Sequence, residues 1–169
     1  GTITWTYDNL YRLTDDVRSG VNTHFEYDAA GNRDSMTVNG VTTDYTYNSL
    51  DQLISAGSTT YDYDDRGNLH QVIDGSQTTT YTYDATDRLT MVNGLSSVVQ
   101  YGYDADGRRI KQTVGPQVTN YLWDEASVYG DVVLETDGSG AMLASYTLGG
   151  TGLISQTRSG VTNYYLQDG

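Results

Sequence analysis

Pairs of aromatic residues separated by a single residue, most often polar, recur along the chain, as in Phe25-Glu26-Tyr27 and Tyr61-Asp62-Tyr63. Side chains i and i+2 of a β-strand point to the same face, so each triplet puts two rings on one face of a strand. The triplets occupy residues 5–7, 25–27, 45–47, 61–63, 81–83, 101–103 and 121–123. We therefore expect short strands whose rings form two aromatic ladders on one face of a sheet.

Each triplet ends in an anchor, an aromatic residue followed by Asp or, in one case, Asn. The steps between anchors are 20, 20, 16, 20, 20 and 20 residues, a near-constant period that is typical of stacked repeats. We expect the shorter step to keep the side-chain phase, because four is an even number on a period of two. The anchors are Tyr7-Asp8, Tyr27-Asp28, Tyr47-Asn48, Tyr63-Asp64, Tyr83-Asp84, Tyr103-Asp104 and Trp123-Asp124.

A turn is expected after each anchor, with Asp in first position and, in alternate repeats, Gly31, Gly67 or Gly107 in fourth. This is the pattern of a type I turn in which the carboxylate accepts backbone N–H groups and the glycine is left-handed. Tyr11 takes the fourth position of the first turn, so we expect that turn to differ in shape. The alternation with Asp51 and Asp87 indicates that two repeats form one longer unit.

The strand after each of these turns often opens with leucine and ends at a second, tighter turn. Asn-Gly between apolar residues is the strongest short hairpin signal, and it predicts two-residue hairpins at 39–40 and 93–94, the latter between Val92 and Leu95. Ser19-Gly20, Asp74-Gly75 and Gly115-Pro116 occupy equivalent places.

The period breaks after Trp123-Asp124. Residues 129–136 and 141–147 predict a hairpin around the turn at 137–140, and 153–158 and 161–166 predict another around Ser159-Gly160, with a loose loop at 149–152. We therefore expect residues 1–128 to hold about seven repeats, and 129–169 to continue them as irregular hairpins. The predicted fold class is all-β, with antiparallel hairpins stacked into a spiralling sheet.

The amino-acid composition argues against several classes of function. The 169 residues include 16 Tyr, a hydrophobic fraction of 37% and a net charge of −13. Such a charge repels phosphate backbones, which argues against nucleic-acid binding. There is no Cys for disulfide or thiolate chemistry, and no apolar run approaches the roughly 18 residues of a membrane span. Because the chain starts at Gly1, we expect an internal cut in a longer protein.

The run Tyr-Asp-x-x-Gly resembles the YD repeat, also called the RHS repeat. The match runs roughly over residues 5–129, and the final Asn163-to-Gly169 segment resembles the stretch after the last regular repeat in bacterial members. Its clearest copies are Tyr27-Asp28-Ala29-Ala30-Gly31-Asn32, Tyr63-Asp64-Asp65-Arg66-Gly67-Asn68-Leu69 and Tyr103-Asp104-Ala105-Asp106-Gly107-Arg108.

The resemblance implies a spiralling antiparallel sheet that closes into a hollow shell, which in bacterial polymorphic toxins encloses a toxic C-terminal region. Insecticidal toxin complexes and animal teneurins carry related shells. This chain stops before the self-cleavage region of the toxin members, so no protease aspartates are carried over to it. It contains no toxin domain.

No residue is assigned to catalysis, a cofactor or a metal. The anchor aspartates recur in equivalent environments, whereas a catalytic pair needs unlike ones, so we interpret them as turn caps. An EF-hand loop from Asp104 would need Glu twelve residues along, where Gly115 stands. His24 and His70 have no triad partner at a recognisable spacing.

Two further assignments stay open at this stage. The ring rows can stack on sugars, although the same rings are needed to hold the sheet together, which we favour. Arg33 and Arg109 stand where other repeats have Leu, and they either pair with anchor carboxylates or mark the solvated face.

We therefore expect a structural, non-enzymatic fragment of a secreted or surface bacterial protein, forming part of a β-shell around a passenger or toxin. Alternatives are a carbohydrate- or receptor-binding adhesion module and a self-assembling extracellular β filament. The expected partners are flanking repeats or other copies of the chain, with an enclosed toxin or glycans beyond them.

Overall fold

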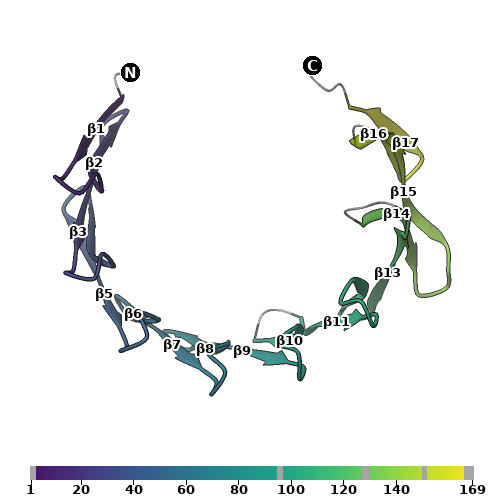
Figure 1. Ribbon diagram of the computed structural model, residues 1–169, viewed down its shortest axis with the longest axis horizontal. Coiled ribbons are helices and arrows are strands. Elements are labelled where there is room, and N and C mark those ends of the chain that lie inside the picture. The colour runs from purple at the N-terminus through teal and green to yellow at the C-terminus, as the bar shows by residue number, and fades with distance from the viewer. Residues whose placement is uncertain (1–2, 95–96, 127–129, 150–151, 166–169) are drawn as a thin grey trace. The chain divides into compact units, whose positions relative to one another are not determined.

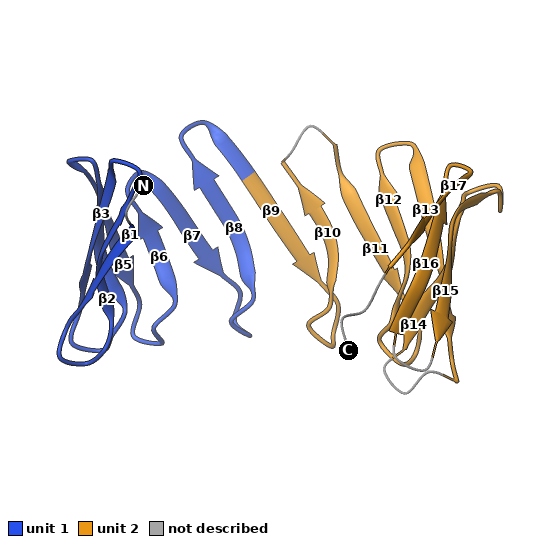
Figure 2. Ribbon diagram, turned by 90° about the horizontal axis from the view of Figure 1, so that it is seen from above, with its two compact units in different colours: residues 1–78 blue, residues 79–169 orange. Residues whose placement is uncertain are grey.

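The computed structural model describes residues 3–94, 97–126, 130–149 and 152–165. These form 17 β-strands and contain no helix (Figure 1), which confirms the predicted all-β antiparallel fold class. The chain divides into two compact units, residues 1–78 and 79–169 (Figure 2).

In the first unit each strand from β1 to β8 pairs antiparallel with the next one along the chain. Two strands and two turns therefore make one repeat, as the sequence pattern predicts. The strands are β1 (Ile3–Tyr7), β2 (Leu13–Arg18), β3 (Val21–Tyr27), β4 (Arg33–Val38), β5 (Val41–Tyr47), β6 (Leu53–Ala56), β7 (Thr59–Tyr63) and β8 (Leu69–Asp74).

In the second unit the same antiparallel order runs from β9 to β17. The strands are β9 (Gln77–Tyr83), β10 (Leu89–Asn93), β11 (Val99–Tyr103), β12 (Arg109–Val114), β13 (Gln117–Asp124), β14 (Asp131–Asp137), β15 (Met142–Gly149), β16 (Gly152–Arg158) and β17 (Val161–Tyr164). We call the strand that ends in an anchor the anchor strand, and the strand after its turn the return strand.

The anchor strands β3, β5 and β7 bury one face more than the other. In β5 the rings of Tyr45 and Tyr47 are buried or half-buried, whereas Asp44 and Thr46 are exposed. The core is thin, because the described residues below about a tenth exposure are few: Tyr45, Val92, Ala144, Ser35 and Ser155. Half-buried rings therefore supply much of the apolar packing, as expected for a core rich in tyrosine.

The shorter step between anchors keeps the phase of the rings. The hairpin of β6 and β7 has strands of four and five residues, compared with six and seven in β4 and β5. Tyr63 pairs with Leu69 just as Tyr47 pairs with Leu53. The predicted phase is confirmed, because an even number of residues has been removed.

The tight turns adopt two different geometries. Ser19-Gly20, Asn39-Gly40 and Ser159-Gly160 have positive φ at both residues, as in the type I′ turn that Asn-Gly predicts. At Asp74-Gly75 the prediction is one residue out, because β8 includes Asp74 and the turn is made by Gly75-Ser76. Gly75 alone has positive φ there, which fits a type II′ turn with glycine first.

The predicted two-residue hairpin at Asn93-Gly94 is wrong. β10 ends at Asn93 and β11 begins only at Val99, so a longer connection replaces the tight turn. Asn93 lacks the positive φ that a type I′ turn requires at its first position. Leu95, expected to open the next strand, lies outside the described residues.

The tail keeps the antiparallel order beyond the last anchor. Its four strands β14 to β17 fall close to the predicted segments, although Tyr129, Gly150, Thr151 and Leu166 lie outside the described residues. The proposed boundary between regular repeats and tail at residue 128 also lies outside them and stays a prediction.

Candidate functional site: the junction between repeats

The anchor carboxylate organises the turn that comes after it, which we call the Asp turn and number from that residue. In the turn of Asp64, the side-chain Oδ1 accepts the N–H groups of Arg66 at 2.9 Å and of Asn68 at 2.8 Å. The backbone closes the same loop, because Gly67 N–H donates to the Asp64 carbonyl at 2.9 Å. One carboxylate oxygen thus accepts the backbone N–H groups of the turn that have no backbone acceptor.

The same arrangement recurs in both units. Asn48 substitutes for Asp in the third turn, and its amide oxygen accepts the N–H groups of Leu50 and Gln52 at 2.9 and 3.0 Å. An uncharged acceptor with the same geometry is therefore sufficient for this turn. Turns of this kind start at Asp8, Asp28, Asp64, Asp84 and Asp104.

The first turn does not differ in shape from the others, so that prediction is wrong. Tyr11 adopts the left-handed conformation at φ 60°, like Asp51 at 58° and Gly67 at 86°. Its N–H donates to the Asp8 carbonyl at 3.0 Å, which closes the turn in the same way. The hydrogen bonds of Asp8 hold the turn in this shape, although a left-handed conformation is strained for Tyr11. The Tyr11 side chain is 88% exposed.

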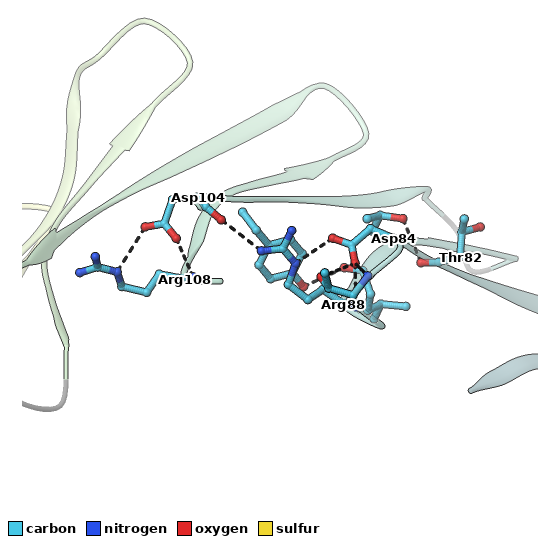
Figure 3. A network of polar contacts seen from close by, with 9 residues as sticks. Thr82, Asp84, Arg88, Asp104 and Arg108 are labelled. Carbon is cyan, nitrogen blue, oxygen red and sulfur yellow. Dashed lines mark hydrogen bonds and ion pairs between the residues drawn. The ribbon is translucent and has the colours of Figure 1, made fainter. Parts of the chain in front are cut away.

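The fifth turn position reaches across to the next repeat. Arg88 binds its own Asp84 (Nε to Oδ2, 2.7 Å), and its Nη1 donates to the backbone carbonyl of Asp104 at 3.1 Å (Figure 3). Arg12 repeats this arrangement in the first unit, donating to its own Asp8 at 2.7 Å and to the Asp28 carbonyl at 3.4 Å. One guanidinium therefore ties two successive turns together.

Neutral side chains at the fifth position make similar bridges. Gln52 Nε2 donates to the Gly67 carbonyl at 3.2 Å, and Asn32 Nδ2 donates to Asp51 Oδ1 at 3.0 Å. The contact between Asn32 and Asp51 accounts for part of the predicted alternation between Gly and Asp in the fourth turn position. Asn32 follows the fourth-position Gly31, and its short amide reaches Asp51, the fourth residue of the next turn.

The same guanidinium groups also cover the rings of the next anchor. Arg12 lies 4.6 Å from the ring centroid of Tyr27, and Arg88 lies 5.0 Å from that of Tyr103. Both distances are within the range of a cation–π interaction, which contributes about 0.5–1 kcal/mol at partly exposed sites. Each arginine thus stabilises its own turn and binds the following anchor.

The anchor hydroxyl makes the third contact between repeats. Tyr103 Oη donates to the Leu89 carbonyl at 2.7 Å, and Trp123 Nε1 donates to the Arg109 carbonyl at 3.1 Å in the equivalent place. The acceptor is the first residue of the preceding return strand. Tyr27, Tyr47 and Tyr63 donate to Leu13, Arg33 and Leu53 in the same way, at 2.8, 3.0 and 3.0 Å.

A bulge accompanies every anchor, and nothing in the sequence pattern predicted it. Tyr27 pairs with Arg33, but Glu26 pairs with Ser35, so Asp34 is left without a partner in the register. A bulge of this kind bends a strand and increases its twist. The extra residues are Thr14, Asp34, Ile54, His70, Thr90, Ile110 and Val133.

Arg33 and Arg109 do not pair with anchor carboxylates. Arg33 lies 4.1 Å from the ring centroid of Tyr45, and Arg109 lies between the rings of Tyr101 and Tyr121 at 5.4 and 5.2 Å. Among the described residues neither guanidinium has an ion pair, so both contribute mainly as flat cations stacked on the ring rows.

The two histidines lie on exposed positions and contact no hydroxyl among the described residues. His24 Nδ1 contacts Asp15 Oδ1 at 2.7 Å on the exposed face, while His70 is an exposed bulge residue. Thr6 also bonds Asp15 and not the histidine, so no hydroxyl is activated as a nucleophile. Across the described ranges, no cluster of three or more His, Asp or Glu side chains could hold a metal ion.

Hydrogen bonds to the Asp turns lower the pKa of several anchor carboxyls. The backbone N–H of Asn68 is the main cause at Asp64, and that of Arg12 at Asp8. At Asp84, partial burial acts to raise the pKa, but the backbone and guanidinium of Arg88 and the contacts of Thr86 outweigh it, and the pKa lies well below its usual range. These carboxylates stay ionised at neutral pH and are unsuited to act as general acids.

The tail contains one more Asp turn, at the opposite end of the strands. Asp137 Oδ1 accepts the N–H groups of Ser139 and Ala141 at 2.8 and 2.9 Å, and Gly140 takes the left-handed fourth position. Because β14 runs antiparallel to β13, this turn lies at the ends of the strands where the regular repeats have their tight turns. The tail therefore contains the same kind of Asp turn at the opposite ends of the strands.

A polar network crosses three strands beside that turn. Arg158 Nη2 donates to the Glu135 carboxylate at 2.9 and 3.0 Å, and Tyr146 Oη donates to Glu135 as well. Glu135 and Arg158 are both paired with Ala144, which is fully buried. Burial and the Glu135 charge raise the pKa of Tyr146.

Solved structures share this fold at low sequence identity. TcdB2-TccC3 without its hypervariable C-terminal region aligns with a TM-score of 0.64 and 13% identity, over 93% of this chain and 10% of that one. TcdB2-TccC3-Cdc42 aligns with a TM-score of 0.63 and 16% identity, over 92% and 11%. These likenesses show the fold alone.

Curated proteins match over shorter segments. The tRNA3(Ser)-specific nuclease WapA of Bacillus spizizenii is 42% identical over 66 residues, which are 38% of this chain and 3% of that protein. The tRNA nuclease WapA of Bacillus subtilis is 44% identical over 52 residues, 31% of this chain and 2% of that protein. The chain thus spans only a few per cent of these relatives.

The predicted repeat family agrees with a match over most of the chain. The Teneurin YD-shell family profile matches residues 1–114, which hold the first six anchors and the junctions between their repeats. This chain belongs to the Teneurin YD-shell family.

Proposed function

We propose that this chain is a structural YD-repeat segment of a secreted or surface-exposed bacterial protein, and that it forms part of a β-shell wall around a passenger or toxin. One observation carries the proposal: the repeated side chains that could perform chemistry are used to bind the next repeat. Arg88 contacts Asp84, the Asp104 carbonyl and the Tyr103 ring at once. The family membership and the TcdB2-TccC3 likeness support a shell context.

The proposal includes the absence of enzymatic activity in this chain. The pKa values of the Asp8, Asp64 and Asp84 carboxyls are lowered, and the anchor turns share one hydrogen-bond arrangement, which disfavours a general acid–base pair with two unlike environments. The nuclease activity in the names of the WapA proteins belongs to those proteins, of which the chain matches 2–3% of the length. The described residues contain no helix that could cross a membrane.

Glycan binding is the less favoured function for the ring rows. Tyr27 and Tyr103 have arginine guanidinium groups on their rings and donate their hydroxyls to backbone carbonyls. A sugar would have to displace these contacts, because ring faces are the surfaces on which pyranoses stack. A glycan array probed with the isolated chain should therefore give no saturable binding.

A domain exchange tests the wall function. The part of the TcdB2-TccC3 shell that superposes on this chain is replaced by residues 1–169, and the C-terminal region of TccC3 is followed during limited proteolysis. With the unexchanged TcdB2-TccC3 as the reference, we expect the chimaera to give that region the same resistance to protease, because the anchor strands supply the same wall geometry.

The matched control chimaera carries Tyr103→Ala and Trp123→Ala, which remove two junction contacts. It should lose protection while a chimaera with Leu122→Ala, an exposed residue between them, keeps it. A chimaera that folds by circular dichroism but leaves the C-terminal region open to protease would refute the wall function. Saturable glycan binding that depends on the tyrosines would favour the adhesion alternative instead.

A further inference from the structure

The dipeptide Asn-Gly occurs twice in the chain, and the two copies lie in unlike structures. We propose that Asn93-Gly94 is a site of spontaneous deamidation in the folded protein, whereas Asn39-Gly40 is protected by its turn. The inference goes beyond the proposed wall function and does not depend on it, because the reaction needs neither a passenger nor a neighbouring repeat.

The reaction is an attack of the main chain on a side-chain amide. The backbone nitrogen of glycine bonds to the Cγ of asparagine, the Cγ–N bond of the amide breaks, and the proton of the attacking nitrogen leaves with the amide group as ammonia. Water then opens the resulting succinimide ring at one of its two carbonyls, which gives either aspartate or isoaspartate. Glycine hinders the attack least, because it has no Cβ. Water is thus the only co-reactant.

The two copies have almost the same neighbours in sequence. Valine precedes each asparagine, at Val38 and Val92. An aliphatic residue follows each glycine, at Val41 and Leu95. The unfolded chain should therefore deamidate at similar rates at both positions, and a difference in the folded chain reports on structure.

Ring closure requires a particular backbone conformation at the asparagine. The glycine nitrogen must lie on the same side of the Cα–C bond as the asparagine Cβ. A left-handed residue has ψ of about +30° to +60°, which places that nitrogen on the side opposite Cβ. Asn39 is left-handed, with φ 48°, in the type I′ turn that it forms with Gly40. It must therefore leave the turn before it can react.

Two hydrogen bonds hold Asn39 in that turn. Its N–H donates to the Asn22 carbonyl at 2.9 Å, and its side-chain Oδ1 accepts the Asn22 N–H at 3.0 Å. The amide that would react thus extends the ladder between β3 and β4 by one bond. Deamidation at Asn39 requires both bonds to break together with the turn.

Asn93 is held less firmly. It is the last residue of β10, it lacks a positive φ, and β11 begins only at Val99, so no two-residue turn fixes it. Its side chain is exposed, and among the described residues neither its amide nor the Gly94 N–H makes a hydrogen bond. What remains is the ladder pairing with Thr80, whose Oγ1 donates to the Asn93 carbonyl at 3.4 Å. Fraying of one strand-end residue is therefore sufficient for ring closure.

Deamidation changes both the charge and the main chain at this strand end. Either product carries a carboxylate, which adds one negative charge to a chain whose net charge is −13. Isoaspartate also adds a methylene group to the main chain before Gly94, so the pairing of residue 93 with Thr80 is shifted. The modified protein can therefore be separated from the parent by charge and identified by its peptide bond.

Peptide mapping of the original chain tests the inference. The folded protein is incubated at neutral pH, sampled over time, digested with pepsin at acid pH and analysed by mass spectrometry. Isoaspartate is detected with protein L-isoaspartyl methyltransferase and labelled S-adenosylmethionine. We expect Asn93 to deamidate at least about tenfold faster than Asn39, the ratio that follows if opening the turn costs about 1.4 kcal/mol more than fraying the strand end.

The urea-unfolded chain is the matched control and should give nearly equal rates at Asn39 and Asn93. Asn93→Gln closes a larger ring more slowly, so it should abolish most of the methylation of the folded chain. Equal rates in the folded chain, faster reaction at Asn39, or a folded chain that stays unmodified at Asn93 while the unfolded chain reacts would each overturn the inference. A rate difference of the same size in the unfolded chain would assign the effect to sequence and overturn it as well.

Discussion

The anchor hydroxyls give a sharp test, because that of Tyr103 is hydrogen-bonded whereas that of Tyr7 has no acceptor among the described residues. Tyr103 Oη donates to the Leu89 carbonyl at 2.7 Å, at a partly buried position. Tyr103→Phe keeps the ring and its contact with Arg88, and removes only the donor. The net contribution of a hydrogen bond of this kind to stability is about 0.5–1.5 kcal/mol.

For a chain of 150–250 residues, 1 kcal/mol corresponds to about 2–4 °C in Tm, so Tyr103→Phe should lower Tm by about 1–6 °C. Tyr7→Phe is the matched control, since its hydroxyl has no acceptor among the described residues and the side chain is 57% exposed. It should change the free energy of unfolding by less than about 0.5 kcal/mol.

Thermal and urea unfolding followed by circular dichroism measure both variants. The reasoning would be refuted by equal destabilisation in the two, or by a Tyr103→Phe chain as stable as the parent. Either result would mean that the anchor hydroxyls do not help to join successive repeats.

Three further changes should have separable effects. Tyr11→Gly should raise the free energy of unfolding by about 1 kcal/mol by relieving a left-handed backbone, while Leu10→Gly, one residue earlier and also exposed, should not. Ala144→Val should destabilise by about 1–3 kcal/mol beneath the Glu135–Arg158 contact, whereas the same change at the exposed Ala141 should be near neutral in urea unfolding. Because backbone N–H groups lower the pKa of Asp64 in the fold, its contribution to stability is present above about pH 4 and lost as the pH falls through the lower folded value. Asp64→Asn should therefore flatten part of the fall in Tm below pH 4, and an unchanged acid profile would show that the Asp64 carboxylate does not contribute to that fall.

Much of the fold is determined by local sequence rules. Alternation at the triplets determines which side chains share a face, and Asp with Gly three residues later specifies the turn. The aromatic triplet recurs seven times in phase, so an unclear signal in one repeat is compensated by clear signals in the others. Ring rows and return strands could therefore be predicted from the chain alone.

The junctions were harder to predict, because they depend on contacts between repeats. Arg12 and Arg88 stand four residues after Asp8 and Asp84, and this recurrence was a usable signal for an ion pair. Nothing local indicates that their guanidinium groups also reach the next anchor. The wrong prediction at Tyr11 has the same origin: local preference disfavours a left-handed tyrosine, but the hydrogen bonds of Asp8 outweigh it.

The tail is also hard to identify as a relative of the repeats. Asp137-Gly138-Ser139-Gly140 has the turn residues but lacks the preceding aromatic triplet, so the sequence predicts only an ordinary hairpin there. Its position at the opposite ends of the strands depends on the antiparallel pairing of β13 and β14. Similarly, the bulge at each anchor leaves no mark in the spacing, because the extra residue lies within the constant 20-residue step.

If the recurring polar and aromatic side chains of each repeat bind the next one, a double-mutant cycle between Arg88 and Tyr103 should show that the two residues are energetically coupled. Arg88→Met removes the cation and its donor while keeping the length of the side chain, and Tyr103→Leu removes the ring that it covers. We expect a favourable coupling free energy of at least about 0.5 kcal/mol in urea unfolding. Additive effects of the two changes, within about 0.3 kcal/mol, would contradict it.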